Sequence, residues 1–289
     1  MCRTNCRFFS ARLDRELDVV ENVDSPGALT ELVNSFLVPK NINILYWNCR
    51  GIARPSFSTH LPYLINTYKP NIVILSETRV SSPNSLTIMR RLPFDSWEIL
   101  DPVGSTGGII ILWNVRVAAI TLVNKGTQII NMVVQVLSTN FVFLLSAIYP
   151  SPKFRNHASL WNELTTLSQK LNTPWNCIGD FNKVTCTADK LGGRGIKLNR
   201  VNIFNSTMDS CNLIDIGSYG PKFTWTIRRC INTIFERLDR VWFNHLWLDN
   251  FLNSHNYPLT CLSSDHCPII LKTSNLTSAR PKTFKVKSF

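Results

Sequence analysis

The stretch Cys177-Ile178-Gly179-Asp180-Phe181-Asn182 is an apolar strand that ends in a turn and then presents an acid and an amide on alternate positions. Near the end of the chain, Ser264-Asp265-His266-Cys267-Pro268 adds a second acid and an imidazole. Two carboxylates, an amide and an imidazole are the groups needed to transfer a proton and to hold a phosphate beside a divalent metal. The predicted function depends on whether these two segments meet in the folded protein.

The composition indicates a folded protein that attracts polyanions. The chain has 289 residues, of which 44% are hydrophobic and 10% aromatic, and this argues against intrinsic disorder. Its 31 Lys and Arg residues against 19 Asp and Glu residues give a formal net charge of +12. Nucleic acid is therefore the first candidate partner, with anionic membranes, phosphorylated lipids or an ordinary solvated basic surface as the alternatives.

Cysteine usage and hydropathy predict an intracellular protein. The nine cysteines include no close C-x-x-C pair, so reduced thiols fit better than a disulfide framework or a zinc ribbon. No apolar run approaches the length of a membrane span, and the basic start lacks the apolar core of a secretory signal. A nuclear location is expected if the protein acts on chromosomal DNA.

Short apolar runs separated by polar turns predict strands at residues 42–47, 72–75, 108–113, 117–123, 129–136 and 141–148. Helical periodicity falls at residues 57–68, 157–171 and 200–211. Strands and helices alternate at first, whereas strand-to-strand hairpins dominate between residues 108 and 148. The pattern predicts an α/β fold in which two packed sheets carry helices on their outer faces.

The folded domain is expected to span residues 41–273. Residues 1–40 are expected to form an N-terminal extension that is partly helical, and residues 274–289 a disordered basic tail. The segment Lys190-Leu191-Gly192-Gly193-Arg194-Gly195 is glycine-rich and basic but lacks the Lys-Ser/Thr ending of a P-loop. We interpret it as a surface loop, with a phosphate-binding loop as the alternative.

Two further strand ends carry polar side chains, because Asn48 follows the first apolar run and Glu77 follows the second. Taken singly, such residues have structural explanations: Asn48 as a turn cap, Glu77 as the surface partner of Arg79, and His266 as a structural histidine. Their recurrence in one order, each after an apolar strand, favours a functional site instead.

Six ordered segments resemble the motifs of the endonuclease/exonuclease/phosphatase superfamily, which includes pancreatic deoxyribonuclease and the apurinic endonucleases. They are Trp47-Asn48-Cys49-Arg50-Gly51, Ser76-Glu77-Thr78, Ile148-Tyr149, Gly179-Asp180-Phe181-Asn182, Arg237-Leu238-Asp239-Arg240 and Ser264-Asp265-His266-Cys267-Pro268. The resemblance covers residues 41–272 and implies a four-layer α/β/β/α sandwich, in which two packed mixed β-sheets are flanked by helices.

Within the superfamily, the chain looks most like the endonuclease domain of plant non-LTR (LINE-type) retrotransposons. The segments that carry this similarity are Trp47-Asn48-Cys49-Arg50-Gly51, Asp189-Lys190-Leu191-Gly192-Gly193, Gly220-Pro221-Lys222-Phe223-Thr224-Trp225-Thr226 and Glu236-Arg237-Leu238-Asp239-Arg240. The similarity implies an endonuclease that nicks DNA.

The resemblance also implies a metal site. Glu77 would bind the divalent ion, and Asn48 and Asp265 would help directly or through a neighbouring group. Mg²⁺ suits these hard oxygen donors, with Mn²⁺ as the alternative.

The remaining motif residues have catalytic roles in the family. Asp180 would orient or deprotonate the attacking water, and Asn182 would position it. His266 would donate to a phosphate oxygen as charge develops, while Asp239 holds the imidazole in its charged form. Tyr149 would hydrogen-bond the phosphate.

Two departures from the family pattern bear on the substrate. Arg50 stands where apurinic endonucleases usually carry an acid, although retrotransposon relatives resemble this chain in having arginine there. Pro150-Ser151-Pro152 follows the tyrosine where some relatives carry an asparagine. Both departures argue against specific repair of abasic sites.

A cluster of basic and aromatic residues lies just before the Asp239 motif and is a candidate for DNA contact, namely Lys222, Trp225, Arg228 and Arg229. Arginine and lysine contact phosphates, and an aromatic ring can wedge against bases or sugars. Alternatively, Trp225 is a core residue, since Phe223 and Trp225 alternate as on one face of a strand.

The leading hypothesis is a Mg²⁺-dependent endonuclease that nicks DNA. The rivals within the superfamily act on inositol phosphates, lipids or poly(A). A second class of hypothesis is a catalytically silent mobile-element remnant that binds nucleic acid. A phosphoprotein-binding or membrane-binding module has only the charge in its favour.

Overall fold

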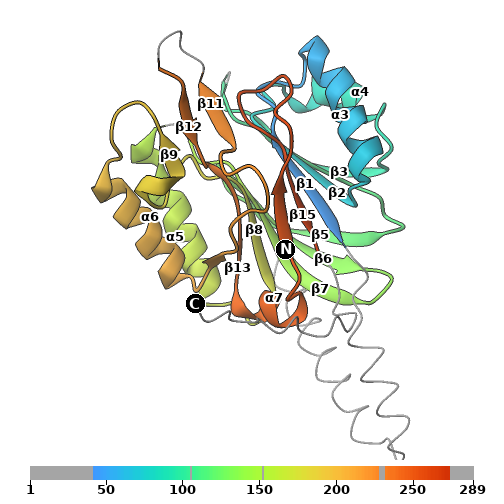
Figure 1. Ribbon diagram of the computed structural model, residues 1–289. Helices are drawn as coiled ribbons and strands as arrows, with labels where there is room; N and C mark the ends of the chain where they lie inside the picture. The colour runs from blue at the N-terminus through green and yellow to red at the C-terminus, as the bar shows by residue number, and fades with distance from the viewer. Residues whose placement is uncertain (1–41, 105, 152, 228–231, 274–289) are drawn as a thin grey trace, which may run out of the picture. The chain divides into compact units, whose positions relative to one another are not determined.

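The computed structural model describes residues 42–104, 106–151, 153–227 and 232–273 (Figure 1). The predicted N-terminal extension and basic tail lie outside these residues, and so do the candidate DNA contacts Arg228 and Arg229.

The first sheet has six strands in the order β14-β15-β1-β2-β4-β3. The parallel pair in this sheet is β1 and β2, and the other neighbours are antiparallel. The strand bounds are β1 Asn43–Asn48, β2 Ile72–Ser76, β3 Ser96–Leu100, β4 Ile109–Trp113, β14 His255–Pro258 and β15 Ile269–Lys272.

The second sheet also has six strands, in the order β10-β13-β8-β7-β6-β5, with β7 and β8 as its parallel pair. Its strands are β5 Ala118–Lys125, β6 Ile129–Val136, β7 Phe141–Ile148, β8 Trp175–Asp180, β10 Ile214–Asp215 and β13 Asp239–Phe243. A small third sheet joins β11 Trp225–Ile227, β12 Ile234–Glu236 and β9 Lys190–Leu191.

The fold has four layers because the central strands are apolar on both faces, so that each sheet packs against the other sheet on one face and against helices on the other. Ile44 and Tyr46 of β1 belong to one buried cluster with Ile178 of β8 and Val241 of β13, which fills the space between the sheets. The intervening Leu45 and Trp47 belong to a second cluster, which includes side chains of α3 (Pro55–Tyr68) and α4 (Ser82–Met89).

The outer face of the second sheet is covered in the same way by α5 (His157–Ser168) and α6 (Leu198–Ser210), seen on the left of Figure 1. Two 3₁₀ turns, η1 (Phe154–Asn156) and η2 (Thr187–Asp189), and the short helix α7 (His245–Asn250) complete the described elements. The predicted α/β/β/α sandwich with two mixed sheets is confirmed.

Gly179 is required where the two central strands of the second sheet approach each other. It pairs with Ile148 across the parallel β7 and β8 strands. A Cβ atom at this position would lie 2.0 Å from the carbonyl oxygen of Ile148. The glycine before Asp180 is therefore a packing requirement of the strand that delivers this acid.

The strands and helices predicted before residue 150 match the structure closely at their ends, and the three predicted helices are present. One expectation fails: Cys261 and Cys267 are bonded as a disulfide, whereas reduced thiols were expected. The reason is local, since the loop between them brings their Cα atoms to 4.0 Å. No helix among the described residues is long and apolar enough to cross a membrane.

Candidate active site

The two segments that define the sequence pattern meet between the ends of β1, β8 and β13. Asn48, the last residue of β1, donates from Nδ2 to Oδ2 of Asp180 at 2.9 Å. Nε2 of His266 lies 3.6 Å from the same carboxylate oxygen. Asp239 is the register partner of Asp180 across β8 and β13. Three strands and the loop before β15, which are far apart in the sequence, therefore deliver four polar side chains to one place.

Asp180, His266 and Asp239 form a buried chain of charged groups. Nδ1 of His266 lies 2.9 Å from Oδ2 of Asp239, and its Nε2 faces Asp180. Thr224 fixes the far end of the chain, because its hydroxyl oxygen accepts the Asp239 N–H at 2.9 Å. All three members of the chain are at most 4% exposed.

Burial and mutual attraction set the protonation states of Asp180 and His266. Burial raises the pKa of Asp180 to about 6, and Asp239 adds to the rise while His266 opposes it. Burial lowers the pKa of His266, but Asp239 and Asp180 outweigh burial and raise it to about 9. At neutral pH the chain therefore holds an ionised Asp180 facing a protonated His266, which is a base beside an acid.

Tyr46 links the two sheets next to Asp180. Its hydroxyl oxygen accepts the Asp180 backbone N–H at 2.8 Å and lies 2.5 Å from Oγ of Ser76 at the end of β2. Tyr46 is fully buried, and burial together with the nearby Asp180 raises the pKa of its hydroxyl. The phenol therefore stays neutral and fixes the backbone at Asp180.

Asn182 lies in a tight turn after Asp180. Its backbone φ is 51°, and its N–H donates to Oδ1 of Asp180 at 2.8 Å. Its side-chain Nδ2 donates to the carbonyl of Pro150 at 3.2 Å. The turn therefore orients the Asp180 carboxylate and ties it to the segment after β7, where Tyr149 lies.

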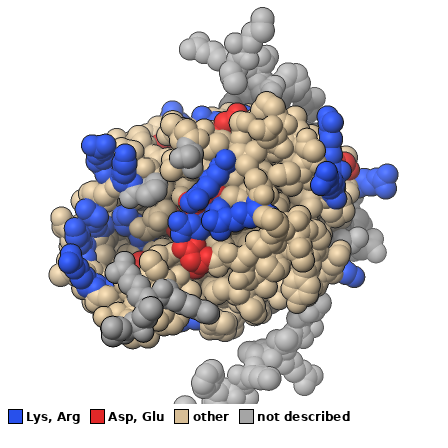
Figure 2. All heavy atoms as spheres, turned by 90° about the horizontal axis from the view of Figure 1, so that it is seen from above, with Lys and Arg blue, Asp and Glu red and all other residues tan. Residues whose placement is uncertain are grey.

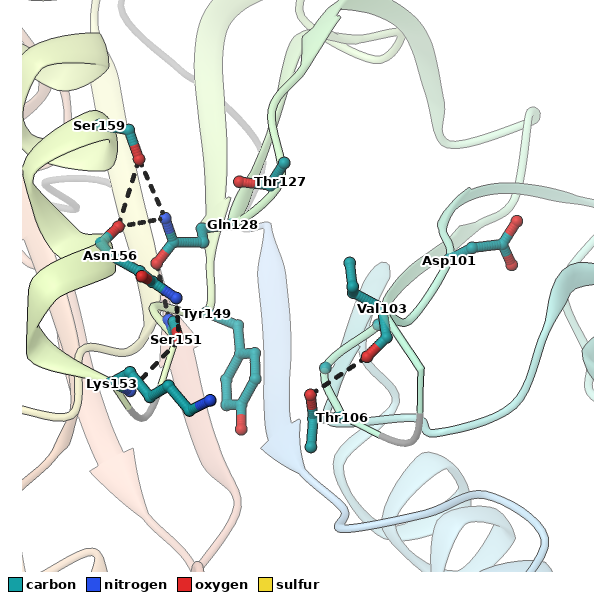
Figure 3. A pocket seen from close by; sticks show the side chains of 12 residues that line it. Asp101, Val103, Thr106, Thr127, Gln128, Tyr149, Ser151, Lys153, Asn156 and Ser159 are labelled. Atoms are coloured by element: carbon teal, nitrogen blue, oxygen red, sulfur yellow. Dashed lines mark hydrogen bonds between the residues drawn. The ribbon is translucent and has the colours of Figure 1, made fainter.

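Tyr149 points into an open cavity of about 640 Å³ (Figure 3). Burial and the charges of Glu77 and Asp180 raise the pKa of its hydroxyl, so it is a neutral hydrogen-bond donor at physiological pH. In Figure 3 the ring lies between Lys153 and the loop that carries Thr106. Polar side chains in the cavity wall include Asp101, Thr127, Gln128, Ser151 and Lys153.

Two of the three predicted metal residues, Glu77 and Asp265, have carboxylate oxygens that face arginines. Glu77 is half of two ion pairs: its Oε1 binds Arg79, and its Oε2 lies 3.5 Å from Nε of Arg50. Arg50 also binds Oδ2 of Asp265. Glu77 is 7% exposed, so its pairing with Arg79 is not the surface ion pair offered as the structural explanation.

The donor set fits a hard divalent cation. Oδ1 of Asn48 is buried and has no hydrogen-bond partner within the described part of the chain. This orphaned oxygen lies on a strand paired with Ser76, the residue before Glu77. Carboxylate and amide oxygens of this kind suit Mg²⁺.

Asp180, Asp239 and His266 also have ligand atoms close enough together to hold a metal ion. However, both oxygens of Asp239 lie within 3.2 Å of Nδ1 of His266. The carboxylate of Asp239 is therefore already engaged by the histidine.

The candidate nucleic-acid residues differ in their placement. Trp225 is half-buried rather than part of the core, and its Nε1 donates to Oδ2 of Asp265 at 3.0 Å. Its backbone forms an isolated bridge with His266. Lys222 is exposed on the loop before β11. Trp225 therefore borders the site.

The glycine-rich segment after η2 is a turn that packs on protein. Lys190 and Leu191 pair with β12, and a Cβ atom at Gly192 would lie 2.4 Å from the carbonyl oxygen of Thr233. This close backbone contact favours the interpretation as a loop over that as a phosphate-binding site.

Sequence reasoning missed several residues that support the site, namely Tyr46, Ser76, Arg79, Thr224 and Ser264. Tyr46 had a detectable signal, since it precedes Asn48 by two positions and so shares its strand face. Ser264 accepts the His266 N–H at 3.1 Å and donates to the Asn48 carbonyl at 2.8 Å. These contacts depend on tertiary structure, which the sequence pattern does not reveal.

The fold is a layered α/β/β/α sandwich that solved nucleases share. The structure is similar to the endonuclease domain of TRAS1, a telomere-specific non-LTR retrotransposon, with a TM-score of 0.61 and 15% identity over 80% of this chain and 98% of that one. The AP endonuclease LMAP from Leishmania major gives 0.64 and 14%, over 90% and 98%. The 3'-5' exonuclease NExo from Neisseria meningitidis gives 0.58 and 16%, over 81% and 100%.

The sequence profile of the Endonuclease/Exonuclease/phosphatase family matches residues 45–266, and the chain belongs to this family. No protein with a curated description matches it in sequence. Family members are hydrolases that act on phosphodiester bonds.

Proposed function

We propose that this protein is a Mg²⁺-dependent endonuclease that nicks DNA, of the retrotransposon type. The observation that carries the proposal is the buried Asp180, His266 and Asp239 chain, which lies beside the oxygen donors of Glu77 and Asn48. A base, an acid and a cation site at one place are the parts that phosphodiester hydrolysis requires.

Asp180 acts as the base. Two donors hold its carboxylate in one orientation, Nδ2 of Asn48 at 2.9 Å and the N–H of Asn182 at 2.8 Å. Because these donors favour the ionised form, they oppose the effect of burial on its pKa. The carboxylate takes a proton from the attacking water, and Asn182 helps to position this water.

His266 acts beside Asp180. Its Nε2 lies 3.6 Å from Oδ2 of Asp180, and in this role its N–H donates to a phosphate oxygen as negative charge develops there. Asp239 binds Nδ1 and keeps the ring protonated. The neutral hydroxyl of Tyr149 donates a further hydrogen bond to the phosphate. Mg²⁺ held by Glu77 and Asn48, with Asp265 beside them, would neutralise phosphate charge.

Charge and shape favour a nucleic-acid strand as the substrate. Figure 2 looks onto the end of the molecule where β11, β12 and α4 lie in Figure 1, and Lys and Arg side chains gather there around a small acidic patch. The cavity beside Tyr149 carries Lys153 and extends the site along this surface. We propose that Lys222 and Trp225, with Arg228 and Arg229 of the same stretch of sequence, contact DNA.

One observation favours a nicking enzyme of retrotransposon type over a repair enzyme. Arg50 binds Glu77 and Asp265 where apurinic endonucleases usually carry an acid. The fold does not separate the two types, since the TRAS1 domain and an AP endonuclease both share it. The closer similarity to plant elements stays a prediction from the sequence motifs.

Conversion of supercoiled plasmid to open circles tests the proposal. We expect the parent to nick plasmid with Mg²⁺ and to stop when EDTA is added, whereas Asp180→Ala and His266→Ala fall by at least about 100-fold. The exposed Asp209→Asn is the matched charge control and keeps the parent rate. Plasmid left uncut by the folded parent would contradict the proposal.

A substrate panel separates the rival functions. Duplex DNA, poly(A) and a phosphoinositide are offered to the same preparation, and DNA is expected to be cleaved fastest. Preferential cleavage of either other substrate would reassign the protein within the family. Salt-dependent DNA binding without metal-dependent cleavage would instead indicate a silent remnant.

A further inference from the structure

Arg50 connects the two carboxylates that the proposed function assigns to the metal. It lies directly after β1, and its guanidinium reaches Glu77 with Nε and Asp265 with Nη1. Arg79 takes the other oxygen of Glu77. Both oxygens of the principal metal carboxylate therefore face an arginine in this structure.

The backbone around this contact is held in an uncommon conformation. Arg50, Glu77 and Arg79 have φ angles of 52°, 53° and 58°, in the left-handed region that residues other than glycine seldom adopt. Such outliers persist where the surrounding structure enforces them, and they gather at functional sites. The turns after β1 and β2 therefore hold the backbone so that these side chains start beside one another.

An arginine and a divalent cation compete for the same oxygens. A metal ion bound by Glu77 would face the positive charge of Arg50 across a few ångströms, and repulsion at this range is strong where solvent is partly excluded. The side chain of Arg50 is 35% exposed, whereas that of Glu77 is 9% exposed, so Arg50 is the partner that can move outward.

A phosphate of the substrate provides the arginine with a new partner. Guanidinium groups bind phosphate oxygens with two parallel hydrogen bonds, as strongly as they bind carboxylates. Tyr149, the proposed phosphate ligand, lies against Gly107, whose carbonyl accepts the backbone N–H of Arg79 at 3.1 Å. Movement of the Arg50 side chain toward this side of the site would exchange Glu77 and Asp265 for the phosphate.

We propose that Arg50 occupies the metal-binding carboxylates in the free protein and moves to the substrate phosphate when the metal binds, so that metal and nucleic acid bind cooperatively. The inference rests on the proposed function of this site. Linkage requires the effect to be reciprocal: DNA raises metal affinity by the factor by which metal raises DNA affinity.

The test measures binding without cleavage. Mn²⁺ affinity of the free protein is measured from the electron paramagnetic resonance signal of unbound Mn²⁺. Affinity for a fluorescein-labelled duplex with phosphorothioate linkages is measured by anisotropy, with and without Mn²⁺. Arg50→Gln removes the charge, Arg50→Lys keeps it without the planar fork, and the exposed Arg54→Gln is the matched control.

Arg50→Gln is expected to bind Mn²⁺ roughly tenfold more tightly than the parent without DNA, because one repulsive charge is removed. Arg50→Lys and Arg54→Gln should stay within about twofold of the parent. Mn²⁺ should raise the parent's DNA affinity roughly tenfold, and this coupling should fall to about twofold or less in Arg50→Gln.

The proposal is overturned if Arg50→Gln binds Mn²⁺ no more tightly than Arg54→Gln, or if Arg50→Lys gains affinity equally. Circular dichroism identifies a misfolded variant. If Arg50→Gln is misfolded, the proposal is tested by the parent alone: Mn²⁺ must raise its DNA affinity by the same factor by which DNA raises its Mn²⁺ affinity. These measurements are independent of nicking. An inactive parent with intact coupling would refute only the proposed function, whereas an active parent without coupling would refute only this inference.

Discussion

Asp189→Asn tests a buried charge network that supports the catalytic strand. Arg240 directly follows Asp239 on β13, and its side chain is fully buried. Its Nη2 donates to Asp189 at 2.5 Å, and its Nη1 donates to Asp215 at 2.5 Å. Asp189 also accepts the hydroxyl of Thr185 at 2.6 Å. The substitution removes one negative charge from this network and changes the side-chain volume little.

The pKa of Asp189 sets the size of the expected effect. Burial raises this pKa, but Arg240 and Thr185 outweigh burial and lower it to about 2 from the ordinary value of 3.8. A decrease of about 1.8 corresponds to about 2.4 kcal/mol of folding free energy at pH 7. Because the folded-state pKa is depressed, this stability is present above about pH 4 and is lost as the pH falls toward 2. About 1.3 kcal/mol remains at pH 3.

Urea unfolding followed by tryptophan fluorescence measures the effect. We expect Asp189→Asn to unfold with a free energy about 2 kcal/mol below the parent at pH 7, and the difference to shrink by about half at pH 3. Asp209→Asn, an exposed acid on α6, changes the same charge and should cost less than about 0.5 kcal/mol. An Asp189→Asn difference that is equally small at pH 7, or that is the same at both pH values, would refute the reasoning.

Two further predictions concern the site itself. The rate of nicking should rise with pH as Asp180 ionises near pH 6, and fall as His266 loses its proton near pH 9. Measured at constant ionic strength, kcat/KM should therefore give a bell-shaped pH profile. A flat profile between pH 5 and 10 would contradict the base and acid roles. Tyr46→Phe removes the acceptor of the Asp180 N–H and should lower the free energy of thermal unfolding by about 1–3 kcal/mol. It should also lower kcat with little change in KM. An unaltered kcat would show that Tyr46 does not position Asp180.

Much of the sandwich could be predicted from the sequence because its central strands are long and apolar. The runs that form β1, β2 and β4 to β7 have few alternative structures, and their ends were predicted closely. The short strands β9 to β12 could not be predicted in the same way, since two or three residues carry no periodicity and their pairing depends on distant partners. The polar strand ends could be found because each follows an apolar run.

The contacts that tune the site could not be read from the sequence. Arg50 was noted as a departure from the family pattern, but its binding of Glu77 and Asp265 depends on two tight turns and a loop that lies 215 residues further along the chain. The Cys261–Cys267 disulfide likewise arises from the path of one loop. Spacing along the chain predicts which face a side chain occupies, whereas the partner opposite that face comes from the packing of the sheets.

The proposed catalytic groups end the apolar layer between the sheets, and this placement explains their electrostatics. On β1 the inward face carries Ile44, Tyr46 and then Asn48. On β8 Ile178 precedes Asp180 by two residues, and on β13 Asp239 precedes Val241 by two, so each acid continues the face of a core residue.

The same packing that excludes water from the isoleucines and valines therefore excludes it from the two acids and from His266, which packs beside them. Because these three residues are buried, they determine one another's protonation states. Burial alone raises the pKa of Asp180 and lowers that of His266. The 2.9 Å contact between His266 and Asp239 reverses this for the histidine and leaves Asp180 as the group with a pKa near neutrality. The base and the acid of the proposed reaction thus arise from one structural cause, the closure of the two sheets over the ends of β1, β8 and β13.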